Sequence, residues 1–181
     1  MKKILSTVAA AAVLATSGLA SDVNFDTNKA YLSAGIAAEM MDGADTGFAL
    51  VLGGGVPFMK AGPGTLAVEG EFTYSISGPS LGDWEATIMN LGAYAAWKYD
   101  INKQFYVKPR AGLVYTSVDQ DYSGPTYGYS VGSYSDSSIG LSVGVAGGYV
   151  ITKNWDATVA FNMNLSDYDA NYLVVGAQYN F

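Results

Sequence analysis

The stretch WDATVAFNMNL, residues 155–165, alternates between two kinds of side chain. Its odd-numbered positions are all apolar, from Trp155 to Leu165, whereas most even positions are polar, beginning with Asp156 and Thr158. An alternation of period two is typical of a β-strand, because successive side chains point to opposite faces of a sheet. The stretch therefore predicts a strand with one apolar and one polar face.

The same alternation recurs along the chain, with clusters of Gly, Pro, Asn and Asp between the runs. Each run has about 10 to 14 residues, longer than an ordinary globular strand and long enough to cross a membrane at a tilt. The eight runs cover residues 29–41, 47–58, 65–77, 87–99, 105–118, 138–151, 155–166 and 171–181. Short turns follow the second, fourth and sixth runs, and mostly longer loops follow the others, the longest being 119–138.

One parity of every run has no charged residue, and the opposite parity mixes charges with Gly, Ser, Thr and Asn. A soluble barrel would keep the apolar parity inside, whereas a transmembrane barrel turns it outward to lipid. Small residues such as Gly53 and Gly144 suit a crowded lumen, and aromatic residues such as Trp97 and Tyr149 gather near the turns, as in an interfacial girdle. We therefore predict an all-β fold, an eight-stranded antiparallel up-and-down transmembrane β-barrel.

The first twenty residues have the layout of a secretory signal peptide. Lys2 and Lys3 precede an apolar run that is too short to span a bilayer, and small residues lead up to Ala20. The predicted organisation is a cleaved signal peptide at 1–20, a short N-terminal periplasmic segment at 21–28 and an outer-membrane barrel at 29–181.

Gly176, Tyr179 and Phe181 resemble the C-terminal signal by which the outer-membrane assembly machinery recognises its clients, although Val174 stands where a polar residue is usual. Together with the leader and the eight runs, these residues make the mature chain similar to the OmpA/OmpX-type small outer-membrane β-barrel family. The resemblance implies an integral protein of a Gram-negative outer membrane that contacts lipid and lipopolysaccharide. It also implies the barrel domain alone, without a peptidoglycan-binding domain.

Composition excludes several kinds of chemistry. A net charge of −7 argues against nucleic acid as a partner, and the absence of cysteine excludes disulfides. Small outer-membrane barrels that act as enzymes generally rely on histidine, and the sequence has none. We therefore expect no enzyme activity, no cofactor and no specific metal site.

Six charged residues lie on the inward parity of the predicted barrel. Eight strands enclose only enough space for side chains, so buried charges there must pair. We expect bridges between two glutamates of the third run and two bases of the fifth, which would plug the lumen; the alternative is a set of wet, loosely paired charges. The six residues are Glu39, Glu69, Glu71, Lys98, Lys108 and Arg110.

Nine acids lie in the predicted outer loops, which contain no Lys or Arg. Ca²⁺ or Mg²⁺ could bridge this rim to lipid phosphates, or the acids could simply keep the surface solvated. The acids are Asp42, Asp45, Asp83, Glu85, Asp119, Asp121, Asp136, Asp167 and Asp169.

These features favour a monomeric structural or surface-interaction protein with a side-chain-plugged lumen. Two alternatives remain open at this point: a small cation-preferring pore, and an adhesin or defence protein that acts through the 119–138 loop on a host or surface ligand.

Overall fold

The computed structural model describes residues 25–122, 134–165 and 170–181. The predicted signal peptide, the middle of the predicted 119–138 loop, and Asp167 and Asp169 lie outside the described residues. Within the described ranges, no helix is long and apolar enough to cross a membrane. The only helix there is η1 (Thr27–Lys29), a single 3₁₀ turn.

Nine strands account for most of the described chain. They are β1 (Tyr31–Met40), β2 (Gly47–Ala61), β3 (Gly64–Ser77), β4 (Ser80–Leu81), β5 (Trp84–Asp100), β6 (Phe105–Tyr122), β7 (Tyr134–Val150), β8 (Trp155–Leu165) and β9 (Asn171–Asn180).

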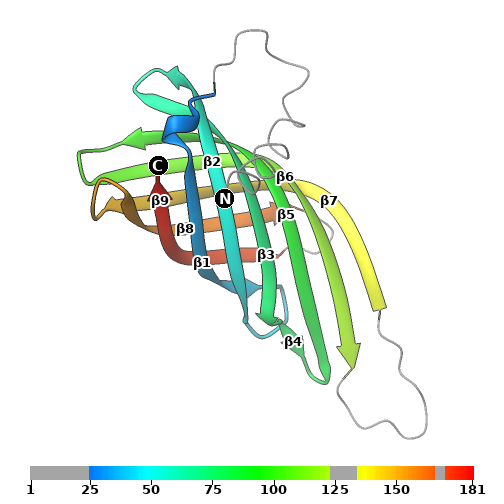
Figure 1. The fold of residues 1–181 in the computed structure, drawn as a ribbon. Coiled ribbons are helices and arrows are strands. Elements are labelled where there is room, and N and C mark those ends of the chain that lie inside the picture. Colours follow the sequence, from blue (N-terminus) through cyan, green and yellow to red (C-terminus); the bar gives the residue numbers. More distant parts are fainter. Residues whose placement is uncertain (1–24, 123–133, 166–169) are drawn as a thin grey trace, which may run out of the picture.

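The sheet formed by these strands closes on itself (Figure 1). Successive long strands pair antiparallel, and β1 pairs with β9 along a seam from Tyr31↔Asn180 to Met40↔Asn171. The two-residue β4 pairs only with β5, and β3 also pairs with β5 directly. The result is a closed eight-stranded antiparallel barrel, which confirms the predicted fold class.

Three tight turns lie at one end of the barrel, which we call the turn end. Asn102 Oδ1 accepts hydrogen bonds from the backbone N–H groups of Gln104 and Phe105, at 2.8 and 2.9 Å. Thr152 Oγ1 accepts similar bonds in the turn between β7 and β8. Gly62, in the turn between β2 and β3, has a φ of +59°, which favours glycine. Local turn chemistry therefore explains why these connections are short.

The opposite end, which we call the loop end, differs from the prediction. β5, β6 and β7 extend beyond the predicted runs, so the supposed loop at 119–138 begins and ends as strand. On the outward face the apolar pattern stops at Met89 of β5, Tyr115 of β6 and Ile139 of β7, while pairing continues to Glu85↔Asp121 and Gln120↔Tyr134. The apolar pattern marked only the part of each strand that faces lipid. The backbone ladder continues beyond that part, through polar residues.

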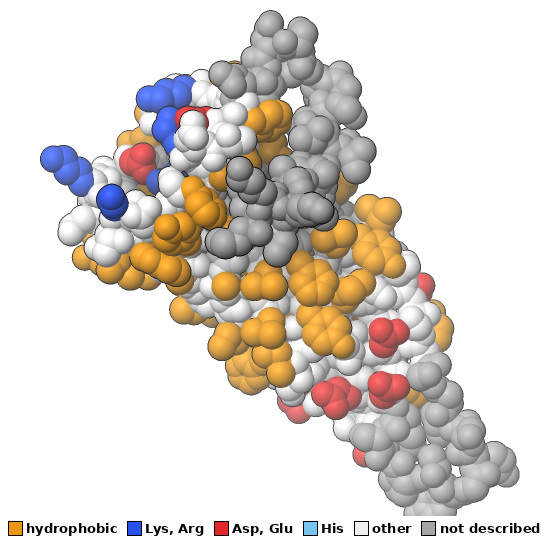
Figure 2. Space-filling model, in the orientation of Figure 1, with side chains coloured by type: hydrophobic (Ala, Val, Ile, Leu, Met, Phe, Trp, Pro, Cys, Tyr) orange, Lys and Arg blue, Asp and Glu red, His pale blue; other side chains and the backbone are white. Residues whose placement is uncertain are grey.

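The outward face of the barrel is apolar and exposed. Ile139 is 72% exposed, Val175 63% and Leu52 57%, while Glu39 and Asp156 on the inward parity are almost completely buried. Figure 2 shows hydrophobic side chains over the visible middle of the barrel, with Lys and Arg gathered at the turn end and Asp and Glu at the loop end. A water-soluble barrel would have the reverse arrangement, so this surface is the one that faces lipid.

Candidate functional site

Four charged side chains meet in the lumen between β3 and β6. Lys108 Nζ and the Tyr31 hydroxyl both donate to Glu69 Oε1, and Arg110 Nη1 lies 3.4 Å from Glu69 Oε2. Arg110 Nη2 donates to both carboxylate oxygens of Glu71, at 2.8 and 2.7 Å. We call Glu69, Glu71, Lys108 and Arg110 the lumen charge cluster. Its two acids and two bases balance in formal charge.

Glycines on the neighbouring strands leave room for the cluster. Gly55 and Gly53 of β2 stand opposite Glu69 and Glu71 in the register. A Cβ on Gly55 would lie 2.5 Å from the Tyr31 hydroxyl oxygen and 3.0 Å from Glu69 Cγ. A larger residue at this position would therefore displace the two groups that hold Lys108 in place.

The Arg110 guanidinium is also held by neutral groups. Its Nε donates to Asn162 Oδ1 at 2.9 Å, and its Cζ lies 4.4 Å from the centre of the Tyr94 ring. Arg110 is only 9% exposed. Because every contact of this fork is buried or nearly so, losing the arginine would leave two carboxylates without their strongest partner.

Two of the six residues predicted for the lumen do not join the cluster. Glu39, which is 0% exposed, accepts a hydrogen bond from Ser75 Oγ at 2.5 Å, and its Oε1 has no hydrogen-bond partner among the described residues. Lys98 lies near the turn end, where its Nζ pairs with Asp100 Oδ1 at 3.3 Å and lies 4.2 Å from the centre of the Tyr106 ring. The inward parity is as expected, but these two residues lie away from the cluster.

An apolar group in the loop-end half of the lumen was not anticipated from the sequence. Ile88 and Val118 are almost completely buried and pack with Ala37, Ala49 and Tyr172. The sequence already places these residues on the inward parity. They were missed because the prediction for the lumen considered only charged residues. The lumen thus has a layer of paired charges toward the turn end and, toward the loop end, an apolar layer that also encloses the buried polar residues Glu39, Ser75 and Asn90.

Little free space is left around the lumen charge cluster. The cavity that Glu69, Glu71, Lys108 and Arg110 help to line has a volume of about 50 Å³. That volume has room for very few water molecules.

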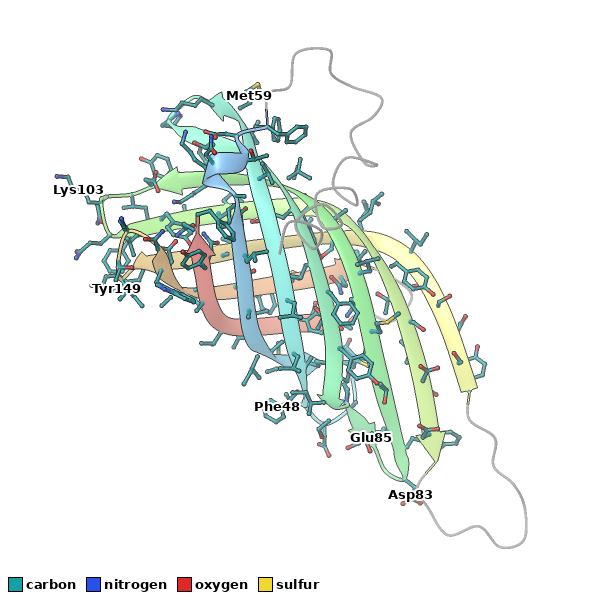
Figure 3. The ribbon with its side chains drawn as sticks, in the orientation of Figure 1. Phe48, Met59, Asp83, Glu85, Lys103 and Tyr149 are labelled. Carbon is teal, nitrogen blue, oxygen red and sulfur yellow. The ribbon has the colours of Figure 1, made fainter. Side chains whose placement is uncertain are left out.

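Seven of the nine predicted rim acids are described, and all are exposed at the loop end. Asp42 and Asp45 lie between β1 and β2, Asp83 lies just before β5, and the others lie on strands and not in loops (Figure 3 labels Asp83 and Glu85). Glu85 and Asp121 are direct cross-strand partners on the outward face of β5 and β6. Over the described part of the chain, no three acids gather closely enough to hold a metal ion.

The residues of the predicted assembly signal lie on β9 and just after it. Tyr179 contacts both Trp155 and Phe181 edge to face, with ring centres 5.1 Å apart in each pair. The Phe181 backbone N–H donates to Ala30 O at 3.1 Å, so the ladder between β9 and β1 extends to this residue. These rings form part of an aromatic band at the turn end.

Comparison with known proteins agrees with this architecture. A family model described as the outer membrane protein beta-barrel domain matches residues 6–181. No curated protein sequence matches the chain.

Solved structures with the same fold include three small outer-membrane barrels. The attachment invasion locus protein Ail of Yersinia pestis is 18% identical, with a TM-score of 0.56 over 84% of this chain and 98% of its own; it has also been solved with the heparin analogue sucrose octasulfate. Neisserial surface protein A is 20% identical, with a TM-score of 0.55 over 84% of this chain and 96% of its own. The N-terminal barrel of Pseudomonas aeruginosa OprF is 13% identical, with a TM-score of 0.54 over 85% of this chain and 98% of its own. At these identities the likeness extends to the fold alone.

Proposed function

Because the chain belongs to the family of outer membrane protein β-barrel domains and is integral to that membrane, we propose that it is a non-catalytic surface-interaction protein whose lumen is closed by its own side chains. The observation that carries the proposal is the lumen charge cluster, which joins β3 to β6, contacts Tyr31 of β1 and Asn162 of β8, and leaves a cavity of only about 50 Å³ beside it. An ion would have to displace a buried, paired charge in order to pass.

The apolar layer supports the same conclusion from the other half of the lumen. Ile88, Val118 and Tyr172 pack together where a conducting path would need water. These bulky side chains narrow the path, although the buried polar residues Glu39 and Asn90 lie beside Tyr172. Packing therefore closes the loop-end half of the lumen, and paired charges close the turn-end half.

The projecting ends of β5, β6 and β7 are the part we propose for contact with a partner. On this extension, residues 134–140 of β7 pair with β6, and Tyr134 and Ile139 are 58% and 72% exposed. Exposed segments that project from a rigid scaffold are available for contact with other proteins. The nearby Glu85, Asp119 and Asp121 are exposed acids, which favour a basic or uncharged partner. A sulfated polyanion such as the one bound to Ail would be repelled here.

Planar-bilayer recording of the purified, refolded protein tests the closed lumen. The parent should show no steady channel openings, and Arg110→Ala should raise the conductance because Glu69 and Glu71 lose their common partner. Arg110→Lys keeps the positive charge without the two-pronged geometry and should have an intermediate effect.

Lys103→Ala, an exposed change in the turn between β5 and β6, is the matched control and should leave the conductance unchanged. Steady cation-selective openings of the parent protein would overturn the closed lumen and support a small cation-preferring pore.

A further inference from the structure

A large hollow lies inside the mouth of the barrel at the turn end. Its volume is about 940 Å³, near the upper end of the usual range for small-molecule sites. Its lining comes from η1 and the residues just before it, from all eight long strands, and from the turn between β7 and β8. We call this hollow the turn-end vestibule.

The vestibule ends at the lumen charge cluster. Tyr31 and Lys108 line both the vestibule and the small cavity of about 50 Å³ beyond it. The vestibule is therefore a blind pocket if the lumen is closed as proposed above. A solute that enters from the turn end would meet the Lys108–Glu69 pair as its floor.

Positive charge is in excess on the vestibule wall. Five lysines line it, against three aspartates. Three of the lysines are engaged: Lys29 with Asp26 at 2.7 Å, Lys98 with Asp100 at 3.3 Å, and Lys108 with Glu69. The hydrogen bond from Lys29 also lowers the pKa of Asp26.

The other two lysines, Lys60 and Lys153, are exposed and make no ion pair with any described residue. Lys60 lies near the end of β2, and Lys153 lies in the turn between β7 and β8. They thus come from different hairpins that border one hollow.

The third aspartate does not compete for these free lysines. Asp156 is 2% exposed, and its Oδ2 accepts hydrogen bonds from Tyr106, Gln178 and Asn180, at 3.2, 3.4 and 3.1 Å. Three neutral donors thus satisfy this carboxylate, as a buried acceptor requires. The negative charge of Asp156 remains in the wall but is buried, so the exposed side-chain charges without an ion pair among the described lining residues are those of Lys60 and Lys153.

We propose that the turn-end vestibule binds a compact multivalent anion that carries phosphate or carboxylate groups. Lys60 and Lys153 would neutralise separate acidic groups of the anion. The Asn180 side-chain amide, which keeps one N–H beyond its bond to Asp156, and the Thr65 hydroxyl line the same hollow and offer hydrogen-bond donors. A multivalent anion fits better than a single charge because the two free lysines lie on different elements.

Calorimetric titration of the refolded full chain in an uncharged glucoside detergent tests the proposal, with inorganic pyrophosphate and citrate as the probes. We expect saturable binding of at least one probe with one site per chain. Lys60→Gln and Lys153→Gln should each weaken that binding about tenfold. Lys103→Gln, an exposed change at the same end but outside the vestibule lining, should leave the affinity unchanged.

Two results would overturn the proposal: no saturable binding of either probe, or an equal loss for Lys103→Gln, which would mean attraction to surface charge in general. Binding of pyrophosphate alone would assign the phosphate class, and binding of citrate alone the carboxylate class. The titration is independent of the closed lumen, because a conducting lumen would be detected in the bilayer recordings and not here.

Discussion

Glu39 and Glu69 are two buried glutamates in one lumen with opposite surroundings. Glu69 contacts Lys108, Arg110 and Tyr31, whereas Glu39 contacts Ser75 and leaves Oε1 without a partner among the described residues. Ser75 does not depend on Glu39, because its Oγ also accepts from the Ile88 N–H at 2.9 Å and lies 3.2 Å from Ile88 O. The Glu69 carboxylate therefore balances the charge of buried cations, whereas the Glu39 carboxylate satisfies no group that lacks another partner.

We therefore expect methionine to have opposite effects at the two positions. Glu69→Met should lower the free energy of unfolding by about 3–5 kcal/mol, because the buried Lys108 loses its acid partner while Arg110 keeps only Glu71. Glu39→Met should raise it by about 1–3 kcal/mol, because a buried polar atom without a partner is removed at nearly constant size. Urea unfolding in lipid vesicles, followed by tryptophan fluorescence, measures both; a similar loss for the two variants would contradict this assignment.

Phe181 allows a second prediction at the same scale. Phe181→Ala removes a girdle ring but keeps the backbone bond to Ala30, so the refolded protein should keep its stability to within about 1 kcal/mol. If the ring is read by the assembly machinery, folded protein in the outer membrane should decrease while export stays constant. Phe105→Ala is the matched control, since both rings are 48% exposed and both contact a girdle tyrosine. Equal decreases for the two variants would exclude a specific assembly role.

At the scale of elements, the extended ends of β5 and β6 place acids just beyond the apolar band. Glu85 and Asp121 face each other across the ladder, and Asp119 stands opposite Thr87 on the same outward face. Like charges in direct cross-strand positions are destabilising unless something screens them. Lipid phosphates beside these acids would add further negative charge. We therefore propose that a divalent cation binds between the acids and the lipid phosphates.

In membranes that contain lipopolysaccharide, a chelator should lower the melting temperature of the parent protein. The combined variant Glu85→Gln, Asp119→Asn, Asp121→Asn should not respond, because its outward face has lost the charges that would hold the cation. Asp136→Asn should respond like the parent, since Asp136 pairs with Val118 and shares its inward parity. A chelator effect of equal size in all three proteins, or in none, would show that the acids are ordinary solvated residues.

The strands were largely predictable from the sequence. The positions of the lumen residues along the barrel axis were not. Alternation located every long strand, because lipid on one face and a crowded lumen on the other impose period two. Parity also placed Glu39, Lys98 and Arg110 on the inner face. Parity does not predict which inward residues lie at the same position along the barrel axis, because the stagger between neighbouring strands determines that position. Glu39 and Lys98 therefore share the predicted inward parity of Glu69 and Arg110 but lie at other levels of the lumen.

At the scale of the whole molecule, every strand of the barrel wall has two neighbours, while the extension at the loop end pairs less extensively within the described part of the chain. Trp97 and Trp155 lie at the turn end of the closed wall, and Trp84 begins β5 in the extension, beside β4. The wall should unfold as one cooperative unit, because removing any strand opens the whole sheet.

Variants that keep a single tryptophan test this expectation by fluorescence during urea unfolding. Trp97 and Trp155 should report the same midpoint, and Trp84 should report a lower one. Midpoints that differ between Trp97 and Trp155 would mean that the barrel wall has separable parts.

The seam between β1 and β9 constrains how the molecule can be made. It joins Tyr31 to Asn180, so the contacts that complete the sheet are among the most distant in the chain. An open sheet that lacks only this seam has two edge strands with unpaired backbone N–H and C=O groups. The hydrocarbon of the bilayer cannot form hydrogen bonds with these groups. Membrane insertion of the sheet and pairing of β1 with β9 therefore have to occur together. Otherwise an assembly protein has to cover the edge strands until β9 pairs with β1. Once the seam has formed, the barrel wall has no edge strand at which unfolding could begin. The lifetime of the folded protein in the bilayer is therefore governed by the kinetic barrier to unfolding.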